Sequence, residues 1–265
     1  MNEENKHLVS ILITCHNYEK FVKQCIQSAL LQDYPNIIIA IIDDASTDKS
    51  WDIIKETINH CGNEEYIDKD IDGRRVIAIK QNIPLGTSLS RNRLIQETWD
   101  ADFFMILDAD DEIMTSKTSI LLYHILNFPN VGLTYADYQI LTVSSGLSAV
   151  EYKIPYSFAR LRHECIVHSG ALISKNAIVA TMEGDNVFDE KLHLPPSKGK
   201  SACIEDYDLF LRISEKFMIL HVPIPLSIVR VHGDNSSNME KMDQEVVKRD
   251  FEYMRKKAEN RAMNK

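Results

Sequence analysis

The sequence predicts an α/β fold with a mostly parallel central sheet flanked by helices, which is a Rossmann-like arrangement. Three observations predict it: apolar runs alternate with amphipathic segments, the runs are rich in branched residues, and polar clusters follow where the runs end. Alternating strands and helices are typical of βαβ units, which build parallel sheets. Such sheets bind ligands at the carboxyl ends of their strands.

Strands and helices alternate clearly in the first half of the chain. Four apolar runs are predicted to be buried strands, at 9–14, 37–42, 76–79 and 103–107. The second run is continuously apolar, which is typical of a parallel strand covered on both faces. Apolar residues at three- and four-residue spacing predict helices at 18–32, around Trp51, Ile54 and Ile58, and at 88–99. Pro35 is expected to end the first helix, and Ser46 or Thr47 to cap the second.

The second half is less regular. Residues 131–142, 219–222 and 228–231 are predicted strands, and 209–217 lies in a helix that Glu205 and Asp206 open. A terminal helix is predicted over 239–260, with Met239, Met242, Val246 and Met254 near one face. The segment 193–202 combines Pro, Ser, Gly and Lys and is predicted to be a mobile loop.

Composition narrows the class of protein. The 265 residues carry 39 acidic and 30 basic side chains, and the net charge of -9 disfavours binding along the phosphate backbone of nucleic acid. Five cysteines without a CxxC pair favour reduced thiols and a cytoplasmic protein. The N-terminus lacks an apolar leader, and no run reaches the ~18 apolar residues that span a bilayer. Any membrane association is therefore expected to be peripheral.

Three polar clusters follow apolar strands and are expected to meet at one edge of the sheet. They are residues 14–17 (TCHN), the pair Asp43 and Asp44, and residues 108–111 (DADD). Asp108 and Asp110 alternate on a turn, where two carboxylates can bind a hard divalent cation such as Mg²⁺ or Mn²⁺. The alternative is a polar turn whose carboxylates cap the next helix. A calcium loop of the EF-hand type is excluded, because Ile113 and Ser119 stand where Gly and Glu are needed.

Other candidate residues have a structural alternative beside the functional one. Thr14, Asn17, Asp43 and Asp44 could contact a nucleotide or could cap and link turns. Arg91 could reach a diphosphate or lie on an exposed helix face. Asp206 could be a general base or could complement the dipole of its helix, and His232 could bind a metal or be structural. His163, Cys165 and His168 indicate zinc only weakly, since four ligands are the norm. Walker A, GxGxxG and GxSxG motifs are missing from the sequence.

Six segments in order resemble the family 2 inverting glycosyltransferases, whose fold is called GT-A. These segments are VSILITCHNYEKFVKQCIQSALLQDYPN, IIDDASTDKSWDII, NIPLGTSLSRN, FMILDADDEI, FDEKL with EDYDLFLRI, and VRVHGDNSS. They run from about Val9 to Ser237, which is nearly the whole chain. Ser90 departs from the family pattern, in which a small apolar residue precedes Arg-Asn. The stretch 193–203 is longer than the usual link, and we expect it to form a flap over the donor.

The resemblance implies a role for each matching residue. A nucleotide-sugar site is implied for Thr14, Asn17, Asp43, Asp44, Arg91, Asp108 and Ala109. Asp110 and His232 are implied to bind Mn²⁺ or Mg²⁺, and Asp206 is implied to be the catalytic base. The resemblance also implies a single GT-A catalytic domain over 1–237, with a nucleotide-sugar-binding half at about 8–112, an acceptor-side half at about 113–237, and a terminal helix at 238–265.

The implied activity is metal-assisted transfer of a sugar, with inversion, from a nucleotide-diphosphate sugar to an acceptor hydroxyl. A UDP-sugar is the expected donor, and the acceptor is left open between a glycan, a lipid carrier and a protein, with nucleic acid disfavoured. A nucleotidyltransferase is disfavoured because the loop after the first strand reads TCHNYEK, without Gly. The remaining alternative is a non-catalytic component of a glycan assembly complex, although both Asp110 and Asp206 are present.

Overall fold

The computed structural model of the chain describes residues 6–168, 170–192, 204–233, 235 and 244–263. The predicted loop and flap at 193–203 lie outside this range. The strands are β1 (Val9–Cys15), β2 (Ile37–Asp43), β3 (Tyr66–Ile71), β4 (Arg74–Lys80), β5 (Phe103–Asp108), β6 (Glu112–Ile113), β7 (Val131–Thr142), β8 (Leu147–Glu151), β9 (Leu172–Ser174) and β10 (Met218–Val231). The helices are α1 (Val22–Leu30), α2 (Ser50–Thr57), α3 (Thr87–Glu97), α4 (Lys117–Asn127), α5 (Phe158–Leu161), α6 (Lys175–Thr181), α7 (Glu205–Ser214) and α8 (Gln244–Met263).

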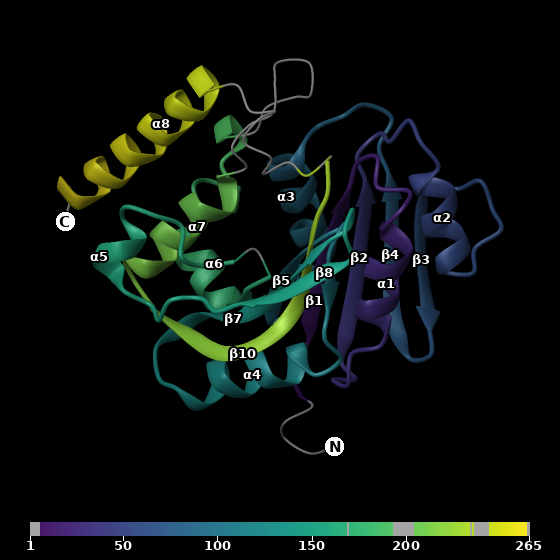
Figure 1. Ribbon diagram of the computed structural model, residues 1–265, viewed down its shortest axis with the longest axis horizontal. Helices are drawn as coiled ribbons and strands as arrows, with labels where there is room; N and C mark the ends of the chain where they lie inside the picture. The colour runs from purple at the N-terminus through teal and green to yellow at the C-terminus, as the bar shows by residue number, and fades with distance from the viewer. Residues whose placement is uncertain (1–5, 169, 193–203, 234, 236–243, 264–265) are drawn as a thin grey trace.

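One sheet runs through the molecule and confirms the predicted α/β fold. Its strand order is β3-β4-β2-β1-β5-β9-β7-β10-β6, with β8 paired to β7. The strands β4, β2, β1 and β5 form a parallel core, in which Cys15 is opposite Asp43 and Thr14 is opposite Asp108. The carboxyl ends of these strands therefore lie side by side, as the sequence predicts. Figure 1 shows β3 at one side of the molecule and the terminal helix α8, in yellow, at the other.

Both faces of the sheet are covered, which explains why its central strands are apolar throughout. Successive residues of a strand point to opposite faces, so Ile11 and Ile13 join one hydrophobic cluster while Leu12 joins the other. The first cluster includes buried residues of α1, α2 and α4, and the second includes residues of α3, α6 and α7. The two layers hold the strand ends, and hence the loops that follow them, at fixed positions.

Several local predictions were incomplete or wrong. The two short strands predicted at 219–222 and 228–231 form the single strand β10, with irregular register against β7 around Pro225. Neither Ser46 nor Thr47 caps α2, because the Ser50 N–H donates to the Asp48 carboxylate at 2.9 Å. The sequence reading also missed the β3–β4 hairpin. Its turn is Asp72-Gly73, with φ of 52° and 81°, a dipeptide that strongly favours such turns.

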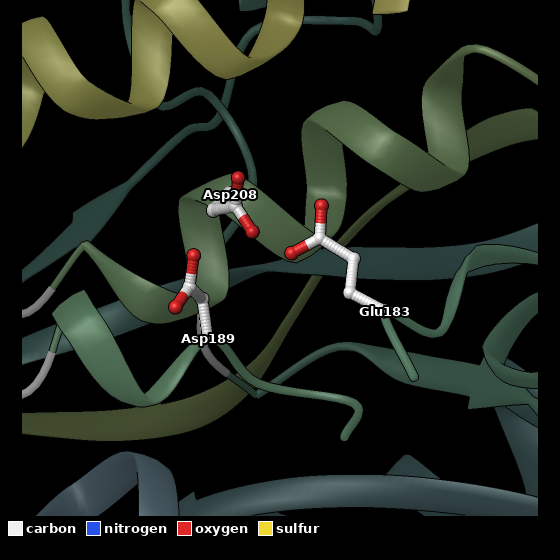
Figure 2. Close-up of side chains that lie close together, drawn as sticks. All are labelled: Glu183, Asp189 and Asp208. Carbon is white, nitrogen blue, oxygen red and sulfur yellow. The ribbon is translucent and has the colours of Figure 1, made fainter. Parts of the chain in front are cut away.

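The terminal helix α8 is held by a cluster of charged side chains that includes Asp208 of α7. Its Lys257 lies among three carboxylates, those of Glu183, Asp189 and Asp208, which Figure 2 shows turned toward one another. The Lys257 ammonium is 2.6 Å from Glu183 and 3.3 Å from Asp208, and it also contacts Asp189. These carboxylate oxygens lie within 4.8 Å of one another, a spacing that a metal ion could use. Because Lys257 already supplies the positive charge, we interpret this cluster as a docking site for α8.

No helix in the described ranges is both long and apolar enough to cross a bilayer.

The role of Lys257 can be tested by the change Lys257→Met, which keeps most of the side-chain length and removes the charge. The three carboxylates would then lack their shared cation, so we expect the free energy of unfolding to fall by roughly 2–3 kcal/mol. Denaturant unfolding measures this. Lys256→Met is the matched control, since Lys256 is exposed on the same helix. Equal stability of the two variants would contradict the docking interpretation.

Candidate active site

The loop after β1 is tied directly to the loop after β2. The Asn17 N–H donates to the Ser46 hydroxyl at 2.9 Å, and the Asn17 side-chain oxygen accepts from the Thr47 N–H at 2.8 Å. Asn17 has a φ of 60°, in the left-handed region that Asn tolerates better than most residues. The backbone conformation therefore fixes the position of Asn17. Ser46 and Thr47, expected to cap α2, link the two loops instead.

Asp44 organises the loop that follows β4. One of its carboxylate oxygens accepts from the Leu85 N–H at 2.7 Å and from the Gln81 side chain at 3.0 Å. The other oxygen accepts from the Gly86 N–H at 2.7 Å. Gly86 has a φ of 87°, which a residue with a side chain adopts only with strain. Asp44 thus fixes the start of α3, which carries Arg91.

Asp43, the residue before Asp44, is fully buried. Its Oδ2 accepts from the Ser46 N–H at 3.3 Å, while its Oδ1 has no hydrogen-bond partner among the described residues. Burial raises the pKa of this carboxyl above its ordinary value. A buried carboxylate oxygen without a donor is costly, which is consistent with a ligand or water donating to it.

The acidic turn after β5 is fastened to the end of β10. The Asp111 carboxylate accepts from the Arg230 N–H at 2.9 Å, and the Arg230 guanidinium donates to the Asp110 carbonyl at 2.8 Å. The guanidinium also pairs with Glu112. Burial, together with the neighbouring Asp110 and Asp108, raises the pKa of Asp111. Arg230 therefore holds the turn in a shape that concentrates negative charge.

Asp110 and His232 meet at this turn, as the metal hypothesis requires. The His232 Nε2 lies 3.1 Å from the Asp110 Oδ2, which also accepts from the Asn235 side chain at 3.0 Å. Two adjacent ligands at about 2.1 Å from one octahedral ion lie about 3 Å apart, so this pair fits a single Mg²⁺ or Mn²⁺. The His232 ring stacks on Phe21 with centroids 4.5 Å apart, which fixes its orientation. An ion held by two protein ligands keeps positions for water and phosphate oxygens.

Arg91 joins the two halves of the chain at this edge. Its guanidinium donates to Asp108 at 2.9 Å and to Glu205 at 2.7 Å, and its side chain is buried. The exposed helix position considered for Arg91 is therefore wrong. Glu205 begins α7, whereas Asp108 ends β5, so one side chain positions the start of α7 beside the acidic turn. Ala109, next to Asp108, is fully buried and packs into the core instead of presenting a side chain.

Asp206 lies next to Glu205 in the first turn of α7. Its Oδ1 accepts from the Tyr207 N–H at 2.8 Å. Burial raises the pKa of Asp206 to about 7, with a further contribution from the negative charge of Glu205. A carboxyl with a pKa near neutrality can both accept and release a proton under physiological conditions. The general-base chemistry suggested for this residue is therefore available to it.

The structure brings most of the candidate residues to one edge of the sheet and adds others that sequence reasoning missed. Thr14, Asn17, Asp43, Asp44, Arg91, Asp108, Asp110, Asp206 and His232 all belong to the strand ends, loops and side-chain contacts described above. The additions are Gln81, Glu205, Arg230 and Asn235. Glu205 begins the segment EDYDLFLRI, and Arg230 and Asn235 belong to VRVHGDNSS, so of the four only Gln81 lies outside the segments that carry the family resemblance. Among the described residues, His163, Cys165 and His168 do not gather into a metal-ligand group.

Comparison with known proteins shows which family the chain belongs to. The profile described as Glycosyl transferase family 2 matches residues 10–163, more than half of the chain. The UDP-Glc:alpha-D-GlcNAc-diphosphoundecaprenol beta-1,3-glucosyltransferase WfaP of Escherichia coli is 34% identical over 133 residues, which are 50% of this chain and 47% of WfaP. The chain thus spans about half the length of the first curated relatives that it matches.

Solved structures share the fold at low sequence identity. The S. aureus TarS 1-349 structure in complex with UDP-GlcNAc aligns with a TM-score of 0.61 and 14% identity, covering 88% of this chain and 61% of that one. The mannosyltransferase PcManGT from Pyrobaculum calidifontis, in complex with GDP-Man and Mn²⁺, aligns with a TM-score of 0.61 and 14% identity, covering 87% and 59%.

Proposed function

Because the chain belongs to glycosyl transferase family 2, we propose that it transfers a sugar from a nucleotide-diphosphate sugar to an acceptor hydroxyl, with inversion at carbon 1. The observation that carries this proposal is the Arg91 bridge, which sets Asp206 beside the acidic turn of Asp108 and Asp110. A candidate base and a candidate cation site are thereby held near the same edge of the sheet. A uridine diphosphate sugar is the donor we favour, since WfaP and the TarS complex both carry uridine nucleotides in their names.

The reaction we propose is a single displacement. The acceptor oxygen attacks carbon 1 of the donor sugar while Asp206 takes the proton from that oxygen. The new carbon–oxygen bond forms as the bond from carbon 1 to the nucleoside diphosphate breaks, and the bonding electrons leave with the diphosphate. One base and no covalent intermediate suffice, and attack from the face opposite the leaving group inverts the centre.

Asp110 and His232 would hold the divalent cation, and Asp108 is close by on the same turn. When bound, the cation would neutralise negative charge on the departing diphosphate. Thr14, Asn17, Asp43 and Asp44 form the side of the edge where we place the nucleoside. Of these, Asp43 has a carboxylate oxygen without a hydrogen-bond partner among the described residues. We therefore expect Asp43 to accept a hydrogen bond from the ligand.

A first prediction concerns the cation. UDP at about 100-fold excess over its Kd should raise the thermal midpoint by roughly 5–10 °C with Mn²⁺ present, and by much less without it. Asp110→Asn should remove the metal-dependent part of the shift, because the amide is a weak metal ligand. Asp52→Ala, a change at an exposed carboxylate on α2, is the control. An unchanged metal-dependent shift in Asp110→Asn would place the cation elsewhere.

A second prediction concerns the base. Asp206→Asn keeps the oxygen that accepts from the Tyr207 N–H but cannot take a proton. We expect kcat to fall by about 10²–10⁴ while UDP still shifts the thermal midpoint. Asp185→Asn, at an exposed position, should leave both quantities unchanged. Loss of UDP binding together with activity in Asp206→Asn would indicate a structural role for this carboxylate.

A third prediction concerns pH. Since Asp206 must be ionised to act, and its pKa is raised to about 7, kcat/KM should fall about tenfold per pH unit below that value. The charge of Glu205 contributes to this rise, so Glu205→Gln should move the acid limb to lower pH. Glu215→Gln makes the same change at the other end of α7 and should leave the profile in place. A limb that moves to higher pH in Glu205→Gln would exclude Asp206 as its source.

A further inference from the structure

A pocket lies away from the candidate active site. It has a volume of about 650 Å³ and lies between the segment that follows β8 and the first residues of β10. We call it the Tyr152 pocket, and the residues used below are Asp137, Tyr152, Lys153, Tyr156, His221 and Pro223. Its volume is within the range of small-ligand sites, about 300–1,000 Å³.

The polar part of the Tyr152 pocket is built around Asp137 on β7. The Asp137 Oδ1 accepts from the Lys153 N–H at 2.7 Å and lies 2.8 Å from the His221 Nε2. The Asp137 Oδ2 is buried and has no hydrogen-bond partner among the described residues. The side chain of Asp137 is only 1% exposed, so leaving one oxygen without a donor is costly. The His221 ring is held by stacking on Tyr135, with centroids 4.9 Å apart.

The rest of the pocket is mainly apolar and aromatic. Tyr152 is 74% exposed at the rim, and Tyr156 and Pro223 also line the pocket. The Lys153 ammonium lies 5.5 Å from the centre of the Tyr138 ring, which does not line the pocket.

These features favour a ligand that has an apolar face and several hydroxyl groups. An aromatic face attracts the C–H groups of such a ligand, and a buried carboxylate oxygen is a strong acceptor for a hydroxyl. A purely apolar ligand would leave the Asp137 oxygen without a donor. An anion such as phosphate would be repelled by the same oxygen. A sugar ring has both required surfaces.

The Tyr152 pocket is separate from the candidate active site but linked to it by α7. Tyr156 interacts with Ser214, the last residue of α7, whereas Asp206 is in the first turn. Eight residues of helix span about 12 Å, so a ligand of several sugar units could reach from one to the other.

We infer that the Tyr152 pocket is a saccharide-binding site for a sugar unit of the acceptor distant from the reacting hydroxyl. The inference rests on the proposed function, because it gives the acceptor a glycan part. The pocket binds that unit through the Tyr152 and Tyr156 rings, while a ligand hydroxyl donates to the Asp137 Oδ2.

Saturation-transfer NMR on the full chain tests this with methyl glycosides of glucose, galactose, N-acetylglucosamine and N-acetylgalactosamine. Saturating UDP and Mn²⁺ are present to occupy the donor site. At least one glycoside is expected to bind the unmodified protein. Tyr152→Ala should weaken that binding about 3–10-fold. Asp137→Asn, which keeps the oxygen facing Lys153 and His221, should also weaken it. The control is Tyr123→Ala, since Tyr123 is an exposed tyrosine on α4.

Two outcomes would overturn the inference: no glycoside binds, or one binds equally well to Tyr152→Ala and Tyr123→Ala. Tyr152 is exposed, so its variant should fold, and equal thermal midpoints of the two tyrosine variants check this. The UDP shift separates the two hypotheses. UDP binding with Mn²⁺ but no glycoside binding would reject the Tyr152 pocket alone, whereas glycoside binding without any nucleotide effect would reject the proposed transfer reaction.

Discussion

The interaction on which the candidate site depends is the contact of one guanidinium with two carboxylates. Arg91 pairs with Asp108 at the end of β5 and with Glu205 at the start of α7, two residues that are far apart in sequence. The Arg91 and Glu205 side chains are only 4% exposed, and unpaired charges would be strongly unfavourable there, whereas Asp108 is 35% exposed. The start of α7 therefore cannot move away from the acidic turn without leaving a buried charge uncompensated. This is why Asp206, the residue after Glu205, is held near the turn.

The position of the site follows from the sequence because the pattern of apolar residues determines the sheet. Continuous apolar runs specify strands covered on both faces, and the residues after them must then lie at one edge. Thr14, Asp43 and Asp108 could be placed together on this ground alone, and the register of β1 with its two neighbours bears this out. Whether a given polar residue contacts a ligand or another loop depends on side-chain partners, which periodicity does not describe.

Such side-chain partners are the part of the site that the sequence alone did not predict. Asp44 accepts from two backbone N–H groups more than 40 positions away, and Glu205 pairs with a residue 114 positions away. Long-range pairs of this kind have no local sequence signal. The β3–β4 hairpin is different, since Asp72-Gly73 is a known turn dipeptide and the alternating polar strand beside it was overlooked. The irregular register of β10 around Pro225 has another cause, because proline lacks the N–H that a regular hydrogen-bond ladder needs.

Two groups of acidic residues in the described part of the chain, Glu183 with Asp189 and Asp208, and the turn of Asp108 and Asp110, have surroundings that lead to opposite interpretations. Glu183, Asp189 and Asp208 offer three oxygens at suitable spacing, which makes them the better cation site by distance alone. Lys257, however, is attached to the same chain and reaches all three, so a free ion would have to displace a tethered ammonium. The Asp110 carboxylate contacts an imidazole and an amide, neither of which carries a fixed positive charge. An incoming divalent ion would gain attraction from this turn without breaking an ion pair at the Asp110 side chain. The number of carboxylates is therefore a poorer guide to a metal site than the counter-charge that the fold already provides.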